Sequence, residues 1–95
     1  MVASNDTIFR EILSNIPEKQ KELLYAIAKE GEAERITSAA FIKRHSLASA
    51  SSVQSAMKKL LEKDIITEIN KVFSVTDKLF AMWMNRMYGN IKNTL

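Results

Sequence analysis

The residues most able to do chemistry are the hydroxyl and ammonium groups between positions 46 and 63. Five serines fall between Ser46 and Ser55, and lysines follow at positions 58, 59 and 63. Serine hydroxyls and lysine ammonium groups both bind phosphate oxygens, but they discriminate poorly between bases. Gln54 has an amide suited to reading a base, and a helical wheel places it at the edge of the buried face. The pattern therefore predicts contact with a nucleic-acid backbone and little reading of sequence.

The same residues also have a purely structural interpretation. Small residues at the start of a helix allow another helix to approach closely, and serines beside a turn satisfy backbone groups. The lysines are then simply the solvated face of that helix. The sequence leaves both interpretations open. Under the first, the candidate DNA-binding residues are Lys43, Arg44, Ser51, Ser52, Ser55, Lys58, Lys59 and Lys71.

The charges are distributed unevenly along the chain. Residues 1–34 carry four basic and seven acidic groups, a balance of −3. Residues 35–63 carry six basic groups against Glu62 alone, a balance of +5, and the rest of the chain has a balance of +1. A basic middle segment is the electrostatic pattern of a surface that faces a polyanion, although a lysine-rich solvated face has the same pattern.

No part of the chain has the spacing of a catalytic or cofactor site. The sequence contains no cysteine, one histidine (His45), and glycine only at positions 31 and 89. It therefore has no disulfide or thiolate metal site, too few ligands for a transition-metal site, and no glycine-rich phosphate loop. We expect a non-enzymatic chain without metal or cofactor, in which His45 caps the C-terminal end of a helix.

A second group of unusual side chains lies near the C-terminus, between residues 79 and 87. Trp83 stands there among methionines at positions 82, 84 and 87. Methionine is flexible and polarizable, so it fills irregular core space or adapts to a partner surface. Core filling is the default interpretation, but the run is more apolar than one buried face requires. Trp83, Met84 and Met87 are therefore the candidate protein-interaction residues, for another domain or a second copy of the chain.

Length and composition indicate one small soluble domain. The 95 residues are 46% hydrophobic and 26% charged, which is typical of a globular chain with a single core. No apolar run approaches the roughly 20 residues that span a bilayer, and no secretory signal is readable. The absence of cysteine fits an intracellular protein, and we expect a cytoplasmic location.

The first third of the chain predicts two helices. Residues 4–15 place Ile8, Ile12 and Leu13 on one side of a short helix, with a cap within residues 4–6. Pro17 stops that helix and opens the next as a first-turn residue. Gly31 follows the second helix, where it is expected as the left-handed C-cap.

The remainder predicts a helix-turn-helix followed by a β-hairpin. A short extended piece at residues 35–36 precedes a helix over residues 38–44, which Thr37 or Ser38 caps. Ser49 caps a further helix over about residues 50–63, whose core face is Val53, Met57, Leu60 and Leu61. The β-branched runs IITEI and VFSVT flank a tight turn at Asn70-Lys71, and Asp77 caps a last helix. This order predicts a mainly α fold, the winged helix-turn-helix arrangement.

Three stretches of the sequence resemble a known family. The stretches KQKELLYAIAKEG, ITSAAFIKRHSLASASSVQSAMKKLLEKDII and VFSVTDKLFAMWMNR look like the C-terminal winged-helix domain of prokaryotic, archaeal-type P-loop ATPases. The most specific part is the pattern V-x-D-x-x-F-x-x-W, matched by Val75, Asp77, Phe80 and Trp83. The resemblance covers roughly residues 16–88.

The resemblance implies that the chain is part of a larger ATP-binding protein whose Walker motifs would lie upstream of these residues. No nucleotide-binding residue can be carried over to this sequence. Contact with double-stranded DNA and contact with the ATPase module of the same native chain both fit the resemblance, and the apolar run between residues 79 and 87 adds a second copy of the chain as a possible partner. We divide the chain into a helical extension (residues 1–15), a winged-helix domain (16–88) and a C-terminal tail (89–95).

Overall fold

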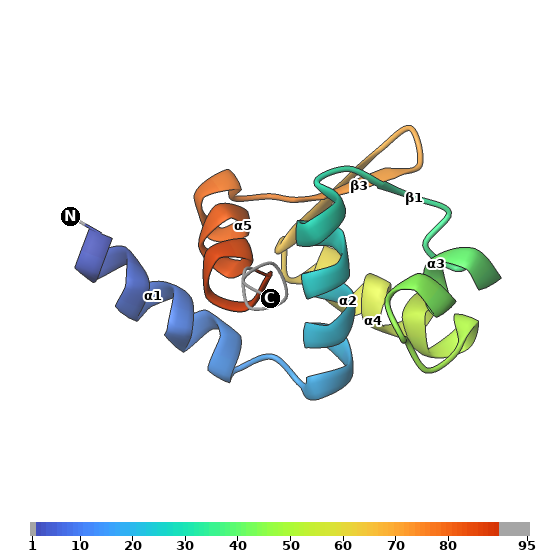
Figure 1. The fold of residues 1–95 in the computed structure, drawn as a ribbon, viewed down its shortest axis with the longest axis horizontal. Helices are drawn as coiled ribbons and strands as arrows, with labels where there is room; N and C mark the ends of the chain where they lie inside the picture. Colours follow the sequence, from blue (N-terminus) through green and yellow to red (C-terminus); the bar gives the residue numbers. More distant parts are fainter. Residues whose placement is uncertain (1, 90–95) are drawn as a thin grey trace.

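The computed structural model describes residues 2–89 of the chain, and the side chains of residues 6–87. Within residues 2–89, no helix is both long enough and apolar enough to cross a membrane. The predicted mainly α fold is confirmed, and one further antiparallel strand extends the predicted two-stranded hairpin into a three-stranded sheet (Figure 1). In chain order the elements are α1 (Val2–Ser14), α2 (Glu18–Glu30), β1 (Ala33–Glu34), α3 (Ala39–Arg44), α4 (Ala50–Glu62), β2 (Ile66–Ile69), β3 (Val72–Val75), α5 (Lys78–Met84) and the π-helical turn η1 (Asn85–Gly89).

Helix α2 is the centre of the core. Its side chains Leu23, Leu24 and Ile27 are no more than 1% exposed, and the helix contacts α4, α5 and β3. Apolar side chains at adjacent positions cover more than one side of a helix, so α2 can be packed from several directions at once. Gly31 ends it with φ of 81°, in the left-handed region that favours glycine, and the C-cap prediction is confirmed.

The sheet has β3 in the middle, with β1 and β2 antiparallel to it on either side. Phe73 and Val75 of β3 are buried, so its inner face packs on the core. The hairpin between β2 and β3 turns at Asn70 and Lys71, whose φ values are 53° and 65°. Positive φ at both central positions is the geometry of a type I′ hairpin turn, so the predicted turn is confirmed with lysine at a position where glycine is usual.

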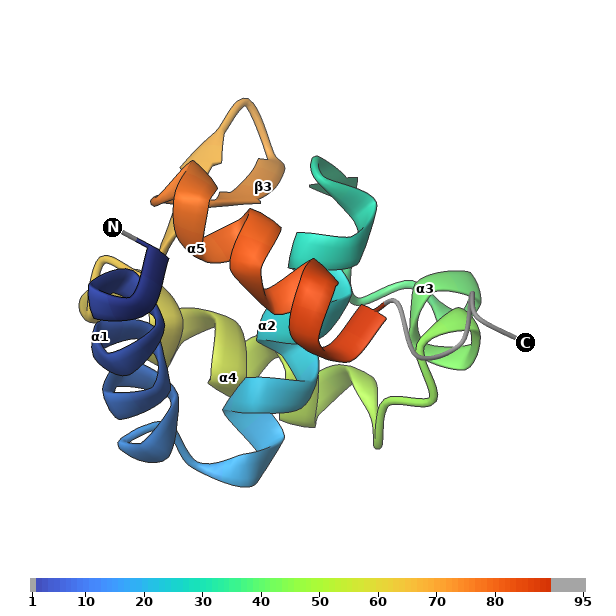
Figure 2. The same ribbon diagram turned by 60° about the vertical axis from the view of Figure 1, so that its left-hand side comes forward.

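Helix α1 lies beside α5 (Figures 1 and 2). The ring centroid of Phe9 is 5.0 Å from that of Phe80 and 5.5 Å from that of Trp83. The indole Nε1 of Trp83 donates a hydrogen bond to Asp6 Oδ1 at 2.5 Å, and Arg10 Nε donates to Asp6 Oδ2 at 2.8 Å. These two bonds, with Trp83 the larger influence, hold the pKa of Asp6 below its usual value. Aromatic packing and one shared carboxylate thus fasten the first helix to the last.

Several predictions for the N-terminal third were wrong. Helix α1 begins at Val2, so Asp6 lies inside the helix and does not cap it. Ile8 is 52% exposed, and Phe9 is buried in its place because it meets the rings of α5. Pro17 is the N-cap residue of α2, one position before the helix, with its carbonyl accepting from Lys21.

The short extended piece also lies earlier than predicted. Strand β1 is Ala33–Glu34, whereas Arg35 has a φ of 52° and leaves the extended conformation. Pairing decides the position, because Ala33 lies opposite Phe73 and Glu34 opposite Val72. The predicted C-terminal tail lies outside the described residues from position 90 onward.

Candidate nucleic-acid interface

The helix-turn-helix is built by α3, a tight turn and α4. The Ser38 hydroxyl accepts from Phe41 N and caps α3, and Phe41 is buried. Ser46 then turns the chain with a φ of 56°, and Leu47 N donates back to Ile42 O at 2.9 Å. Because that bond folds the chain back onto α3, the next helix can start within a few residues.

Helix α4 begins and packs largely as predicted. The Ser49 hydroxyl accepts from Ser52 N at 3.2 Å, which confirms Ser49 as the N-cap. Val53, Ala56 and Leu60 are buried, and α4 packs against α2. Met57 and Leu61, predicted in the core face, are partly buried at its margins. The helix therefore turns a second, different face to solvent.

That outward face carries most of the predicted residues. Ser51, Ser55, Lys58 and Lys59 are exposed, and Ser52 is half-buried. Gln54 is exposed too, so its predicted place at the edge of the buried face was wrong. The buried stripe is narrower than predicted, because it consists of Val53, Ala56 and Leu60 while Met57 and Leu61 are only half-buried. The structure thus adds an amide to a face otherwise made of hydroxyl and ammonium groups.

Charge on this face is only partly balanced by neighbouring carboxylates. Lys59 Nζ is 4.0 Å from Glu62 Oε1, a loose and exposed pair. Lys43, at the end of α3, and Lys58 are exposed, and within residues 6–87 neither has an ion-pair partner. An exposed pair of this kind contributes little, so these ammonium groups stay available to an anion.

Arg44 is differently placed from the lysines. Its Nη1 donates to Glu30 Oε2 at 2.7 Å, and the same oxygen is 2.8 Å from His45 Nε2. These hydrogen bonds, that of Arg44 first, lower the pKa of Glu30. His45 is the C-cap residue of α3, as predicted, and its ring lies 4.6 Å from that of Phe41. Arg44 therefore ties α3 to the end of α2, and much of its charge is already balanced.

The predicted wing residue Lys71 lies apart from the start of α4. Figure 2 shows the hairpin turn at the top of the molecule, whereas α4 begins in its lower half. The pairing of Glu34 with Val72 brings Arg35 and Lys71 to the same end of the sheet. Arg35 was not predicted as a site residue, because only the register of β1 and β3 places it beside Lys71. The structure thus separates the basic groups into a helix face and a sheet end.

The candidate protein-interaction residues, Trp83 and Met84 of α5 and Met87 of η1, are mostly internal. Trp83 is 5% exposed and Met84 is 1% exposed, and Met87 is partly buried against the core. Core filling, one of the two interpretations of this run, is therefore what these side chains do. The exposed apolar side chains of α5 are Leu79 and Met82, each 58% exposed. A partner that docks on α5 would meet those two residues first.

Within residues 6–87, no three histidine or carboxylate side chains are grouped so that they could hold a metal ion.

Comparison with known protein families identifies the class of this chain. Residues 7–86 match the family described as "Probable winged helix domain". The match spans most of the chain and agrees with the helix-turn-helix, the hairpin and the closing helix, so the chain belongs to this winged-helix family. Searches of curated proteins and of solved structures gave no match. Winged-helix domains are commonly DNA-binding or regulatory and are typically non-catalytic.

Proposed function

We propose that this domain binds double-stranded DNA through the outward face of α4, chiefly by contacts to phosphates. The observation that carries the proposal is the outward face itself. It combines exposed serines in the first turns with exposed Lys58 and Lys59 further along, opposite a face buried against α2. In a helix-turn-helix, this second helix is the one that meets the DNA.

The chemistry of the face supports binding to the backbone more than reading of bases. Serine hydroxyls and lysine ammonium groups donate to phosphate oxygens, and the beginning of a helix has a positive dipole end that favours anions. Gln54 is the exposed side chain of this face best suited to a bidentate contact with adenine. We therefore expect weak sequence preference and strong dependence on salt.

A charge-reversal experiment tests the proposal. Binding of the 95-residue chain to a fluorescent 20-base-pair duplex would be measured by anisotropy as the salt concentration rises. We expect Lys58→Glu/Lys59→Glu to abolish binding at low salt. In the unmodified chain, each phosphate neutralised should contribute about −0.9 to the slope of log K against log salt.

The matched control reverses two lysines on other elements. Lys19 in α2 and Lys78 in α5 are both exposed, so Lys19→Glu/Lys78→Glu changes the net charge by the same amount. This variant should lose affinity only slightly. The proposal fails if the unmodified chain does not bind, or if the two double variants lose affinity equally.

We further propose that the domain is a module of a larger cytoplasmic ATP-binding protein of a prokaryote. The support is the sequence resemblance to the winged-helix domain of P-loop ATPases, carried by Val75, Asp77, Phe80 and Trp83. An antibody raised against the domain should detect a native product much larger than 95 residues. A native product of this length would refute the proposal.

A second candidate function is protein contact through α5, either with the ATPase module of the same native chain or in a homodimer. The observation in its favour is the exposure of Leu79 and Met82 on one helix. For self-association, sedimentation at rising concentration should show a dimer that Leu79→Ser/Met82→Ser removes. Ile69→Ser is the control, because Ile69 is a similarly exposed apolar side chain on β2. A monomer at every concentration would exclude the homodimer.

A further inference from the structure

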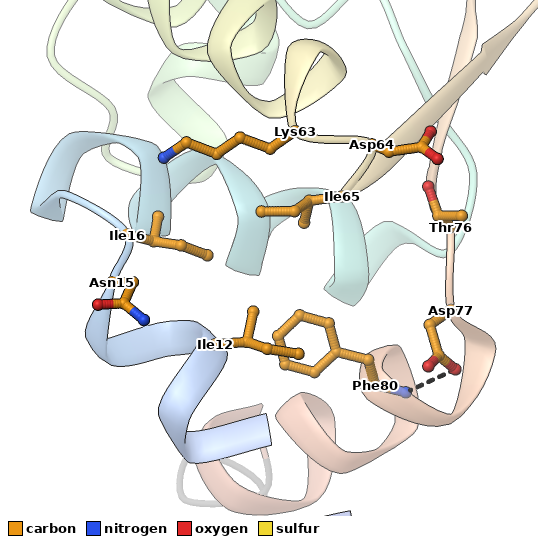
Figure 3. Close-up of a pocket in the computed structure, with 9 residues that line it drawn as sticks. All are labelled: Ile12, Asn15, Ile16, Lys63, Asp64, Ile65, Thr76, Asp77 and Phe80. Atoms are coloured by element: carbon orange, nitrogen blue, oxygen red, sulfur yellow. Dashed lines mark hydrogen bonds between the residues drawn. The ribbon is translucent and has the colours of Figure 1, made fainter. Parts of the chain in front are cut away.

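A pocket of about 460 Å³ opens where α1 meets the rest of the domain. It lies between the last turn of α1, the connection from α4 to β2, and the connection from β3 to α5 (Figure 3). It is separate from the outward face of α4, because none of the serines and lysines proposed to contact DNA lines it. The size falls within the range of pockets that hold small molecules.

The centre of the pocket is apolar. Four apolar side chains from four segments project into it: Ile12, Ile16, Ile65 and Phe80 (Figure 3). Ile16 and Phe80 belong to the buried core of the domain, and Ile12 and Ile65 pack against it. The pocket therefore borders the core directly. An apolar group placed here would leave water and contact all four side chains.

Carboxylates stand on one side of this apolar centre. Asp64, Thr76 and Asp77 line that side in sequence from the α4–β2 connection to the start of α5 (Figure 3). Asp77 Oδ1 accepts from Leu79 N and Phe80 N, which leaves its second oxygen without a partner within residues 6–87. The Asp64 carboxylate has no hydrogen bond or ion pair among those residues. Two carboxylates are thus present with capacity to accept hydrogen bonds.

The lysine of the pocket does not neutralise this side. The Lys63 side chain runs along the upper edge of the pocket, and its ammonium group points away from the two carboxylates (Figure 3). Its Nζ donates instead to Gln20 Oε1 at 3.3 Å. The pocket therefore presents an apolar centre with a negative side, which is complementary to a molecule with an apolar body and a cationic end.

We propose that this pocket binds a small apolar molecule that carries a protonated amine. The apolar body occupies the space between Ile12, Ile65 and Phe80, and the ammonium group lies on the side of the pocket that Asp64 and Asp77 line. An alkylamine or an arylalkylamine has this form, whereas a nucleotide or a carboxylic acid brings negative charge to the carboxylate side. The proposal concerns the α1 side of the domain and does not depend on DNA binding.

Three probes of similar shape test the charge preference: 2-phenylethylamine, 2-phenylethanol and 3-phenylpropanoate. Binding would be followed by amide chemical shifts and by Trp83 fluorescence, because the ring of Phe80 lies 6.1 Å from that of Trp83. The amine should bind about fivefold to tenfold tighter than the alcohol, because an exposed ion pair contributes up to about 1 kcal/mol and there are two carboxylates. The carboxylate should bind most weakly. Equal affinities for the three probes, or shifts centred away from the pocket, would overturn the proposal.

Two variants separate the charge from the apolar space. Asp64→Asn/Asp77→Asn keeps the shapes, because asparagine tolerates the φ of 62° at position 64 and caps a helix as well as aspartate does. This variant should bind the amine and the alcohol equally. Ile12→Phe should fill the space and lower the affinity for all probes while the thermal midpoint is kept.

Glu68→Gln is the control, since Glu68 is an exposed carboxylate on β2 outside the pocket. It should leave amine binding unchanged. A loss of amine preference in this control equal to that in Asp64→Asn/Asp77→Asn would show a general charge effect and refute the site.

Discussion

Helices α4 and α5 have the most unusual compositions in the chain, and they place their distinctive side chains in opposite ways. Helix α4 packs one face on α2 and leaves its serines and lysines in solvent. Helix α5 contacts α2, β3 and α1, so Trp83 and Met84 are enclosed. The number of elements around a helix, more than its composition, decides which side chains remain available to a partner.

The contrast depends on α1. Phe9 of that helix covers the rings of Phe80 and Trp83, and Asp6 accepts the indole N–H. Within the described residues, the outward face of α4 has no corresponding cover. The fold therefore leaves the polar face of α4 in solvent and encloses Trp83 and Met84 of α5, and substitutions at these two places should behave differently.

The largest expected effect on stability comes from removing the enclosed Trp83 side chain of α5. Trp83→Ala removes a buried side chain in contact with two aromatic rings and should lower the free energy of unfolding by about 3–5 kcal/mol. Met82→Ala, on the exposed side of the same helix, should change it by less than about 0.5 kcal/mol. Urea unfolding followed by circular dichroism measures both. Similar losses in the two variants would mean that Trp83 is no more enclosed than Met82.

A smaller effect is expected at the start of each helix. Asp77 Oδ1 accepts from Leu79 N at 2.9 Å and from Phe80 N at 3.4 Å, whereas the Ser49 hydroxyl accepts from Ser52 N alone. Each alanine substitution should cost about 1 kcal/mol, with Asp77→Ala the larger. Asp77→Asn and Ser49→Asp keep a capping acceptor and should retain most of the stability in the same unfolding measurement.

Acid should loosen the contact between α1 and α5. The pKa of Asp6 is lowered in the folded state by the hydrogen bonds from Trp83 and Arg10. A carboxylate with a lowered pKa stabilises the fold above its unfolded pKa, and this contribution disappears as the pH falls through the folded value. The thermal midpoint should therefore decrease as the pH is lowered below about 4, and Asp6→Asn should make this decrease smaller.

Glu11→Gln is the control for acid sensitivity, because Glu11 is an exposed carboxylate of α1 without an ion pair among the described residues. It should leave the pH profile unchanged. Glu30, whose pKa is lowered by Arg44 and then by His45, should add to the same acid sensitivity. An identical profile for Asp6→Asn and the unmodified chain would contradict the role given to Asp6.

The smallest expected effect on stability is at the outward face of α4, and it is a gain where the preceding substitutions cause losses. Ser55 is exposed in the middle of α4, and alanine is the better helix former. Ser55→Ala should raise the free energy of unfolding by no more than about 0.5 kcal/mol while it weakens DNA binding. A loss of stability in this variant would indicate that the serine has a structural role.

Local signals in the sequence predicted the parts of the fold that depend on neighbouring residues. The caps at Ser38, Ser49 and Asp77, the left-handed Gly31 and the Asn70-Lys71 hairpin all follow from short-range chemistry. They were sufficient to predict the winged-helix arrangement and the burial of Val53 and Leu60 in α4.

The errors occurred where distant segments decide the outcome. Phe9 replaced Ile8 in the core because it meets rings more than 70 positions away, and β1 took its place from its pairing with β3. Distant segments also decide which basic side chains of the candidate interface are available. Arg44 is held by Glu30, and Arg35 reaches the end of the sheet through a strand register that no local pattern reveals. Long-range pairing is not visible in a single sequence.

The hairpin turn has a consequence for how this domain would respond to selection for heat resistance. Lys71 has a φ of 65°, in a region that costs a residue with a side chain on the order of 1 kcal/mol and costs glycine nothing comparable. Among variants that survive heating, Lys71→Gly should recur if the hairpin is only a structural connection. If lysine persists at position 71 when survival also requires the protein's activity, then the charge of Lys71 has a functional role that outweighs its cost in stability.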